Sequence, residues 1–498
     1  MKRYAGILAA ALLAGCAPAA PVAAPPAAPA PAPAPTRTAP DASAASAFPT
    51  TAPVPGPAPA VHVPAPERRT LANGLTVLYV RRPEIPTVQA VLVTRGGQSD
   101  DPADLPGLAS FTASMLDEGA GGRSSLELAN ALQLLGARLS TGADWDAATV
   151  GLYVLRDRLP EALMLMSDVV VRPDFPAADV SRIRDETVTN LTRARDNAGA
   201  VAGNAFASLV YGAQHPYGRL ASTETVRRID RNALVNFHRA FYRPAAATLV
   251  LVGDVDAASV HPLVERAFGS WQGGAPAAVP ALAAPTRSST QLYLIDKPGA
   301  PQSEIRIGNP AVQRNSPDYF ALLVMNSLLG GSFTSRLQQN LREAHGYTYG
   351  ARSGLSWRRG VGPFVAQAAV RTAVTDSSLV EFFKELNRIR TEPVPQEELD
   401  RAKRYVSLGL PRDLETNPAL AYSLAGLAVQ GIDPGFYDSY VDRVMAVTAE
   451  DIRRVANQYV RPGQSVVVVV GDLKTIEPGV RALGIGPVEV RPVGDFMR

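Results

Sequence analysis

The sequence predicts an α+β protein built from two duplicated domains, and three observations lead to this fold class. The length of 498 residues exceeds what one hydrophobic core usually organises. Segments with strand-like and helix-like spacing follow one another along the chain, so neither type prevails. A pattern of helix, Arg-Pro turn, apolar strand and Gly-Asp turn also occurs twice, 218 residues apart.

Individual elements can be placed in order along the first domain. An Asn-Gly turn signal within residues 71–80 leads into a β-rich run, and a second strand is predicted over 88–94. Amphipathic spacing predicts helices over 159–171 and 180–195. The apolar run 249–252, directly before a Gly-Asp pair, is typical of a buried strand.

The internal repeat gives the clearest sign of duplication. Arg243, in a Tyr-Arg-Pro turn, is followed after eleven residues by Asp254, and Arg461 is followed after the same eleven by Asp472. A helix-like segment precedes each turn. The period is too long for a solenoid repeat and suits a duplicated domain.

The first sixteen residues are typical of an export signal. Lys2 and Arg3 precede the apolar stretch 7–13, which is too short to span a bilayer, and the stretch ends in Leu-Ala-Gly-Cys16. This ending resembles the lipobox of bacterial lipoproteins, so we expect residues 1–16 to be a signal peptide and Cys16 to be lipidated. Alanine follows the cysteine where aspartate would resemble an inner-membrane retention signal. The predicted location is therefore the periplasm, with a lipid anchor at the outer membrane.

A tether and two domains account for the rest of the chain. Residues 17–66 are almost entirely Ala and Pro, which favours extended polyproline II with a reach of about 150 Å. The Pro/Ala/Gly-rich stretch 273–285 marks a boundary, which places the first domain over 67–275 and the second over 286–498. The net charge is +3 and no long basic run occurs, so nucleic acid is not an expected partner.

Five local patterns resemble the insulinase/pitrilysin family of inverzincin metallopeptidases, in the order of that family. They lie at Gly107–Gly119, Leu134–Ser140, Pro216–Gly218, Tyr242–Asp254 and Leu328–Tyr349. The resemblance covers nearly everything after the tether. It implies two homologous domains, each a sheet covered by helices, arranged as a clamshell around a peptide chamber.

The family's zinc motif, H-x-x-E-H, is altered in this sequence. The resemblance places its three functional positions on Ser110, Ala113 and Ser114, and its distant glutamate on a helix segment that here reads Thr-Val-Thr-Asn-Leu-Thr over 187–192. A serine hydroxyl is a poor zinc ligand, and alanine has no base to offer. We therefore expect no metal and no other cofactor in this chain, with zinc only in a partner.

The sequence gives little support for a metal site built from its histidines or for a serine nucleophile. The histidines lie at least 23 positions apart, at His62, His215, His238, His261 and His345, and so form no local ligand pair. A serine nucleophile at Ser110 or Ser114 would need a base and a third group, and no Gly-x-Ser-x-Gly elbow surrounds either serine. Ser140 stands near the place where the family presents an asparagine to the substrate backbone.

The second domain keeps the residues that the resemblance assigns to substrate. The family carries an arginine and, seven residues on, a tyrosine that contact the bound peptide and the developing oxyanion, and these positions fall on Arg342 and Tyr349. The alternative is structural, with Arg342 in a salt bridge on a helix and Tyr349 packed in a strand.

These residues lead to one main functional hypothesis. The resemblance implies a catalytically inactive subunit that pairs with a zinc-bearing homologue and acts on peptide substrates in the cell envelope, where Arg342 and Tyr349 serve the partner's zinc site in trans. The alternative hypothesis is a peptide-binding or scaffold lipoprotein without a protease partner. Family membership alone would suggest an active zinc peptidase. The residues at the zinc positions argue against that hypothesis.

Overall fold

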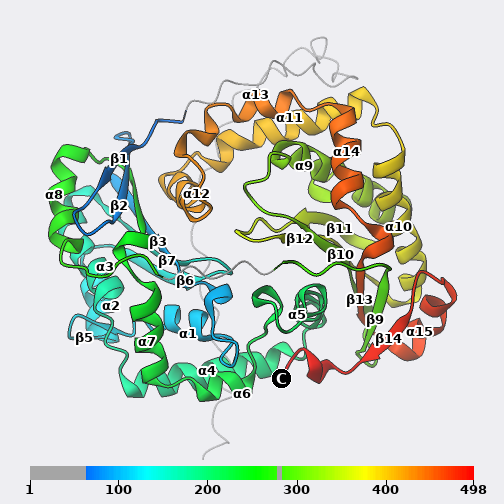
Figure 1. Ribbon diagram of the computed structural model, residues 1–498, viewed down its shortest axis with the longest axis horizontal. Helices are drawn as coiled ribbons and strands as arrows, with labels where there is room; N and C mark the ends of the chain where they lie inside the picture. Colours follow the sequence, from blue (N-terminus) through cyan, green and yellow to red (C-terminus); the bar gives the residue numbers. More distant parts are fainter. Residues whose placement is uncertain (1–62, 277–282) are drawn as a thin grey trace, which may run out of the picture. The chain divides into compact units, whose positions relative to one another are not determined.

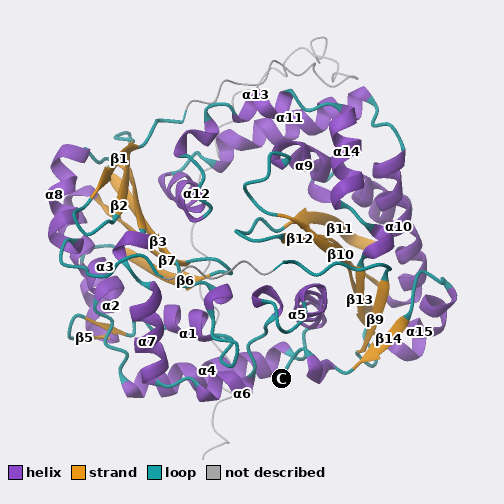
Figure 2. Cartoon of the chain, viewed as in Figure 1, coloured by secondary structure: helices purple, strands orange, loops and turns teal. Residues whose placement is uncertain are grey.

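The computed structural model describes residues 63–276 and 283–498 of the chain. The signal peptide, Cys16, His62, most of the tether and the middle of the interdomain stretch lie outside the described residues. The described residues belong to one compact unit with two sheet-containing halves, here called the first half (63–276) and the second half (283–498). Helices and strands are mixed in both halves, so the predicted α+β class is confirmed (Figures 1 and 2).

The first half is built on a six-stranded sheet with the strand order β1-β2-β8-β3-β7-β6. Its strands are β1 (Glu67–Thr70), β2 (Thr76–Arg81), β3 (Thr87–Thr94), β6 (Arg138–Ala143), β7 (Ala148–Leu155) and β8 (Thr248–Gly253). A small ribbon of β4 (Gly119–Ala120) and β5 (Arg123–Ser124) lies apart from it. The Asn-Gly signal forms the turn between β1 and β2, where the amide of Gly74 donates to the carbonyl of Leu71. Leu249, Val250, Leu251 and Val252 of β8 are fully buried, as their apolar run predicts.

The helices of the first half follow the predicted periodicity. They are α1 (Leu108–Ser114), α2 (Ser125–Leu134), α3 (Leu159–Val171), α4 (Ala177–Ala194), α5 (Ala198–Tyr211), α6 (Thr223–Arg228), α7 (Arg231–Phe241) and α8 (Ala257–Phe268). The helix predicted over 159–171 has the same bounds as α3. The helix predicted from residue 180 begins at Ala177 instead, because Pro176 with its extended backbone directly precedes the first turn.

The second half repeats the same sheet in the order β14-β9-β13-β10-β12-β11. Its strands are β9 (Gln291–Asp296), β10 (Gln302–Val312), β11 (Thr348–Leu355), β12 (Gly362–Arg371), β13 (Val466–Gly471) and β14 (Val488–Arg491). Its helices are α9 (Tyr319–Asn326), α10 (Thr375–Thr391), α11 (Gln396–Asp413), α12 (Asn417–Val429), α13 (Tyr440–Met445), α14 (Ala449–Tyr459) and α15 (Leu473–Ala482), with two π-helical segments, η6 (Ser327–Gly331) and η7 (Gln338–Ala344). The repeated sequence pattern corresponds to α7 and β8 in one half and to α14 and β13 in the other. The sheets differ at the outer strand, since β1 is antiparallel to β2 whereas β14 is parallel to β9.

Each half also places one helix against the sheet of the other half. Helix α5 of the first half packs on β10 and β13, and helix α12 of the second half packs on β3 and β8 (Figure 1). Both helices are rich in Ala, Leu and other small or apolar residues, so most of their circumference can be buried. This exchange joins the two halves through apolar contact.

A polar contact joins the halves at a second place. Asp146 of the first half is buried, and its carboxylate accepts hydrogen bonds from the Tyr217 hydroxyl at 2.7 Å and from the backbone amide of Arg359 at 2.8 Å. Arg359 belongs to the β11–β12 loop of the second half. Neighbouring Arg358 stacks on Trp145 and Tyr217, with its Cζ 4.3 and 4.4 Å from the two ring centroids.

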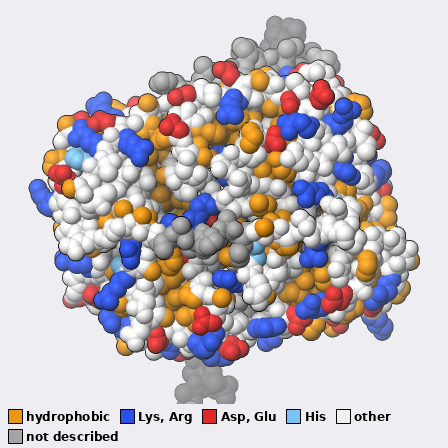
Figure 3. Space-filling model, in the orientation of Figure 1, with side chains coloured by type: hydrophobic (Ala, Val, Ile, Leu, Met, Phe, Trp, Pro, Cys, Tyr) orange, Lys and Arg blue, Asp and Glu red, His pale blue; other side chains and the backbone are white. Residues whose placement is uncertain are grey.

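The surface carries charges of both signs. On the face seen in Figure 3, Lys and Arg side chains are mixed with Asp and Glu side chains, and no broad single-sign area stands out. Among residues 63–276 and 283–498, every helix is too short or too polar to be a candidate for a membrane span.

Candidate functional site

Helix α1 carries the three positions that the family resemblance assigns to zinc chemistry. The helix begins after Gly107, whose φ of 99° is left-handed and whose Cα faces Ala221 so closely that an added Cβ would lie 2.9 Å from the alanine Cβ. The Asp101 carboxylate accepts hydrogen bonds from the amides of Gly107 and Ala109, both at 2.7 Å. The start of α1 is thus fixed by a glycine turn and by an aspartate that caps its free amides.

Ser110 and Ser114 lie one turn apart on α1 and face helix α4 across a cavity of about 340 Å³. Thr187 and Leu191 of α4 line the same cavity. Ala113 is fully buried. The structure therefore brings Ser110, Ser114 and the start of the 187–192 segment together, as the resemblance implies; this arrangement is called the serine cavity below.

The hydroxyls of the serine cavity are engaged in local hydrogen bonds. Gln98 Nε2 donates to Ser110 Oγ at 3.2 Å, Ser114 Oγ donates to the carbonyl of Phe111 at 2.9 Å, and Thr187 Oγ1 donates to the carbonyl of Ile183 at 2.7 Å. The lining of the cavity includes no histidine that could act as a base. This geometry offers no activated nucleophile.

Asp101 is the acidic group in the lining of the serine cavity. Burial raises the pKa of Asp101 to about 7, against the opposing effect of the Gly107 and Ala109 amides that donate to it, and the charge of Asp100 raises it further. Arg219 lies nearby and donates from Nη1 to the backbone carbonyl of Asp101 at 3.1 Å. The cavity thus holds one carboxyl, whose oxygens already cap α1.

The residues at the family's zinc positions do not fit the metal. Zinc in proteins is held by imidazole, thiolate and carboxylate groups, usually three or four of them. Here hydroxyls and an alanine occupy those positions, and in the described part of the chain no three His, Cys, Asp or Glu side chains gather closely enough to hold a metal ion. No catalytic step through zinc can be derived for this chain alone.

The four histidines that the structure describes lie in separate places. His238 is buried and its Nε2 lies 2.8 Å from the carbonyl of Val170, while His261 Nδ1 lies 2.9 Å from the hydroxyl of Tyr79. His215 stacks on Tyr211, and His345 stacks on Tyr347. These are packing and surface environments.

Arg342 and Tyr349 lie together in the second half. The Arg342 Cζ is 5.0 Å from the centroid of the Tyr349 ring and 4.7 Å from that of Phe333, so both rings contact the guanidinium. Tyr349 is 87% exposed and Phe333 is 62% exposed, which contradicts the alternative of a tyrosine packed in the sheet. Arg342 also has a longer ion pair with the adjacent Glu343 at 3.5 Å. Phe333, Arg342 and Tyr349 are called the arginine stack below.

Two segments with irregular backbone position the residues of the arginine stack. Arg342 lies on the π-helical segment η7, and Tyr349 lies where the pairing of β11 with β12 is interrupted between Thr348 and Ala351. Both π-helices and β-bulges are frequent at functional sites, where they redirect side chains. The side chain of Gln338 accepts from the amide of Ala351 at 3.0 Å, which ties the two irregular segments together.

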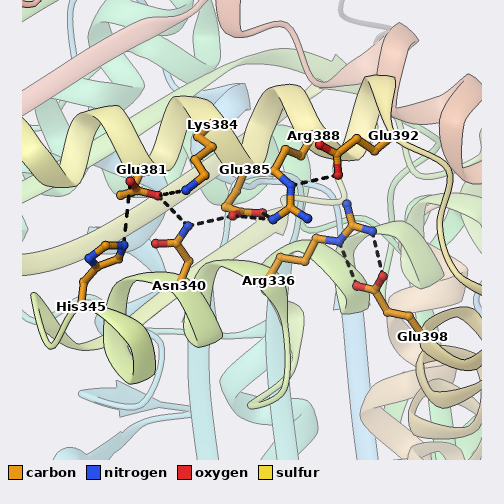
Figure 4. Close-up of polar contacts among 9 residues, drawn as sticks. All are labelled: Arg336, Asn340, His345, Glu381, Lys384, Glu385, Arg388, Glu392 and Glu398. Atoms are coloured by element: carbon orange, nitrogen blue, oxygen red, sulfur yellow. Dashed lines mark hydrogen bonds and ion pairs between the residues drawn. The ribbon is translucent and has the colours of Figure 1, made fainter.

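A polar network joins η7 and its flanking residues to neighbouring helices, as Figure 4 shows. Arg336 forms two hydrogen bonds of 2.8 Å with the Glu398 carboxylate of α11, and Asn340 Nδ2 donates to Glu381 and Glu385 of α10 at 2.7 Å each. The remaining members are His345, Lys384, Arg388 and Glu392. The network fixes the segment that carries Arg342 while leaving its guanidinium at the surface.

The sequence did not predict Phe333 in the arginine stack or Tyr422 beside Ser140. Phe333 completes the arginine stack, and its only sequence signal is an aromatic residue directly after the Gly-Gly-Ser of the second-domain pattern. Tyr422 on α12 is the partner of Ser140, because its hydroxyl lies 3.3 Å from the hydroxyl of Ser140 on the edge strand β6. The absence of a side chain on Gly151 leaves room for Tyr422. A Cβ added to Gly151 would lie 2.2 Å from the tyrosine oxygen. Among the described residues, no hydrogen bond, ion pair or ring contact links the serine cavity to the arginine stack.

Comparison with known families identifies the chain's class. Residues 76–219 match the family model described as insulinase (peptidase family M16), and residues 228–406 match the model described as peptidase M16 inactive domain. Together these stretches span more than half of the chain, which therefore belongs to the insulinase family, peptidase family M16. The stretch matched by the inactive-domain model lies outside α1, so that description does not bear on the altered zinc positions.

Relatives and solved structures agree with this assignment. An uncharacterized zinc protease of Mycobacterium tuberculosis is 25% identical over 425 residues, covering 84% of this chain and 97% of the relative. The mitochondrial-processing peptidase subunit beta of Lentinula edodes is 25% identical over 414 residues, covering 80% and 88%.

Among solved structures, the peptidase M16 inactive domain from Pseudomonas fluorescens matches with a TM-score of 0.77 and 26% identity, covering 82% of this chain and 98% of that one. The periplasmic protease PqqL from Escherichia coli matches in fold with a TM-score of 0.71 and 17% identity, covering 82% and 45%.

Proposed function

We propose that this chain is a catalytically inactive subunit that complements a zinc-bearing homologous subunit in peptide degradation in the cell envelope. The observation that carries the proposal is an asymmetry between the two halves. The serine cavity of the first half has no zinc ligand set, whereas the second half presents Arg342 and Tyr349 at its surface on a supported segment.

The form of the arginine stack supports a role in binding peptides. A guanidinium carries five N–H donors in a planar fork, which suits carbonyl and oxyanion groups. The rings of Phe333 and Tyr349 contact the guanidinium of Arg342 and limit its freedom. Stacking at an exposed site stabilises by only about 0.5–1 kcal/mol per ring. A largely exposed tyrosine beside a supported arginine therefore contributes little to folding, which favours a role in binding.

The place of action in this proposal is the periplasm, with Cys16 anchored in the outer membrane. The support comes from the signal-like first sixteen residues and the Leu-Ala-Gly-Cys ending. The partner is a homologue that carries H-x-x-E-H, and one of the chain's relatives, the mitochondrial-processing peptidase subunit beta, is named as a subunit.

The test is turnover of a reconstituted pair. The chain is mixed at saturation with a zinc-bearing homologue from the same organism, and peptide turnover is compared with that of the Arg342→Ala and Tyr349→Phe variants. Loss of one oxyanion donor typically lowers turnover by a factor on the order of 100 to 1,000. We expect that loss with assembly and melting temperature nearly unchanged.

Matched controls separate this effect from general surface changes. Arg352→Ala removes an exposed arginine from the same strand β11, and Tyr405→Phe removes the hydroxyl of an exposed tyrosine on α11. Both should leave turnover unchanged. If Arg342→Ala and Tyr349→Phe also leave turnover unchanged, complementation in trans is wrong and the peptide-binding or scaffold lipoprotein becomes the better hypothesis.

A further inference from the structure

A second cavity, of about 380 Å³, lies where the two halves meet around α12. Its volume is within the range of about 300–1,000 Å³ that is typical of small-ligand sites. The first half contributes Asp144 and part of the β3–β7 surface, and the second half contributes mainly aromatic and polar side chains. These second-half residues include Arg314, Tyr319, Trp357, Tyr422, Ser423 and Tyr437.

Arg314 is the unusual member of this lining. The residue is only 9% exposed, and its guanidinium has no hydrogen bond or ion pair with any other described residue. Its Cζ lies 3.6 Å from the ring centroid of Tyr319 and 4.7 Å from that of Phe436. Burial lowers the pKa of Arg314, but guanidinium groups remain charged in proteins. The ring faces attract the cation, but they accept none of its five N–H donors in the plane of the guanidinium.

Arg314 shares this situation with the neighbouring Arg358, which is 7% exposed, stacks on Trp145 and Tyr217, and has no hydrogen-bond partner at Nε or Nη1. By contrast, Arg336, whose side chain is 9% exposed, forms two hydrogen bonds with Glu398. The exposed Asp144 in the cavity lining already accepts from the amides of Asp146 and Ala147 at 2.8 Å each. A buried cation without an anionic partner is costly. Because Arg314 lines an open cavity, an anion brought by a ligand can supply that partner.

We infer that this cavity binds a peptide carboxylate through Arg314. The peptide nature of the ligand rests on the proposed function. The carboxylate accepts two N–H donors from the guanidinium fork, which is the geometry that arginine favours. The rings of Trp357 and Tyr422 contact the apolar part of the residue that bears the carboxylate, and the Asp144 carboxylate accepts from a backbone amide of the peptide. The carboxylate is either a C-terminus or an acidic side chain, and the two sources share this chemistry.

Binding to the full-length chain without any partner tests the inference. Three pools of N-acetylated tetrapeptides are compared by equilibrium dialysis and mass spectrometry. The first pool has randomised residues other than Asp and Glu and a free C-terminal carboxylate, the second is its C-terminal amide, and the third is an amide pool with one fixed internal glutamate. Because a charged hydrogen-bonding partner is lost, the second pool should bind about ten- to a hundredfold more weakly than the first. Binding of the third pool at the level of the first assigns the carboxylate to an acidic side chain, and weak binding assigns it to the C-terminus.

Variants locate the binding at the cavity. Arg314→Gln should reduce binding of the carboxylate-bearing pools to the level of the plain amide pool. Ser423→Met fills the cavity while leaving Arg314 in place, so it should weaken every pool and keeps the test valid if Arg314→Gln folds poorly. Arg443→Gln is the matched control, because Arg443 stacks on Phe320 at 4.4 Å in the same aromatic cluster but does not line the cavity.

Two results would overturn the inference. One is equal binding of the free-acid, amide and glutamate pools, including no binding of any of them. The other is unchanged binding of the free-acid and glutamate pools in both Arg314→Gln and Ser423→Met. Neither result bears on the proposed function, which is measured by the turnover of the pair with Arg342 and Tyr349 variants. Conversely, an unchanged turnover in those variants leaves binding by the isolated chain intact.

Discussion

Asp101 should make the stability of this protein depend on pH in a direction opposite to that of most aspartates. Its side chain is buried beside the serine cavity and caps α1 through the amides of Gly107 and Ala109. The perturbation is Asp101→Asn, which keeps the shape and one acceptor oxygen but removes the ionisable group. The variant loses part of the cap at every pH, so the informative quantity is how its stability difference from the wild type changes with pH.

The sign and size of that change follow from the shifted pKa. The native carboxyl holds its proton up to about pH 7, whereas an aspartate in the unfolded chain releases it near pH 4. Between these values the native state binds more protons than the unfolded state, so the free energy of unfolding falls as pH rises. Each unit is equivalent to about 1.4 kcal/mol, so between pH 5 and pH 8 the wild type should lose about 3 kcal/mol relative to Asp101→Asn.

Urea unfolding of the purified protein at pH 5, 6, 7 and 8 measures this difference. A loss of about 3 kcal/mol is a large part of the 5–15 kcal/mol that stabilises a typical protein. The control is Asp157→Asn, at an exposed aspartate of the same half, for which the difference from wild type should stay constant. A difference for Asp101→Asn that is constant within about 0.5 kcal/mol over this range would refute the reasoning, because it would mean that the buried carboxyl is ionised throughout.

Three further predictions concern metal, anchoring and the contact between the halves. After dialysis the isolated chain should retain well below one zinc per chain and should cleave no peptide. The double variant S110H/S114H should bind zinc measurably, because two imidazoles return to one helical face. Tightly held zinc with chelator-sensitive activity in the wild type would contradict this prediction. Cys16→Ser should release the protein from membranes, and an unchanged membrane fraction together with a wild type that carries no acyl mass speaks against the lipid anchor. Asp146→Ala should lower the free energy of unfolding by about 2–4 kcal/mol, because two donors lose their acceptor. Tyr217→Phe should lower the same free energy by about 1 kcal/mol. Equally small losses for both variants in urea unfolding would show that the contact is not buried in solution.

The local sequence determined most of the secondary structure and the duplication. The apolar period of 159–171 reproduced α3 residue for residue, and the two Arg-Pro to Gly-Asp patterns marked equivalent strands in two sheets of the same order. These features are set by side-chain spacing and by turn residues within a few positions, which is why a single sequence contains them. The altered zinc positions were also readable, because a residue type excludes a ligand wherever it lies.

Tertiary structure alone decided what those elements pack against. The exchange of α5 and α12 between the halves could not be predicted, because a helix that is apolar around most of its surface signals burial without naming its partner. The exposure of Tyr349 depends on a strand irregularity next to a π-helical segment. The guanidinium of Arg342 contacts both Tyr349 and Phe333, which lie sixteen positions apart in the sequence. The unpartnered guanidinium of Arg314 is likewise invisible in the sequence, because the absence of a partner is a property of all the side chains that surround it, and these come from both halves of the chain.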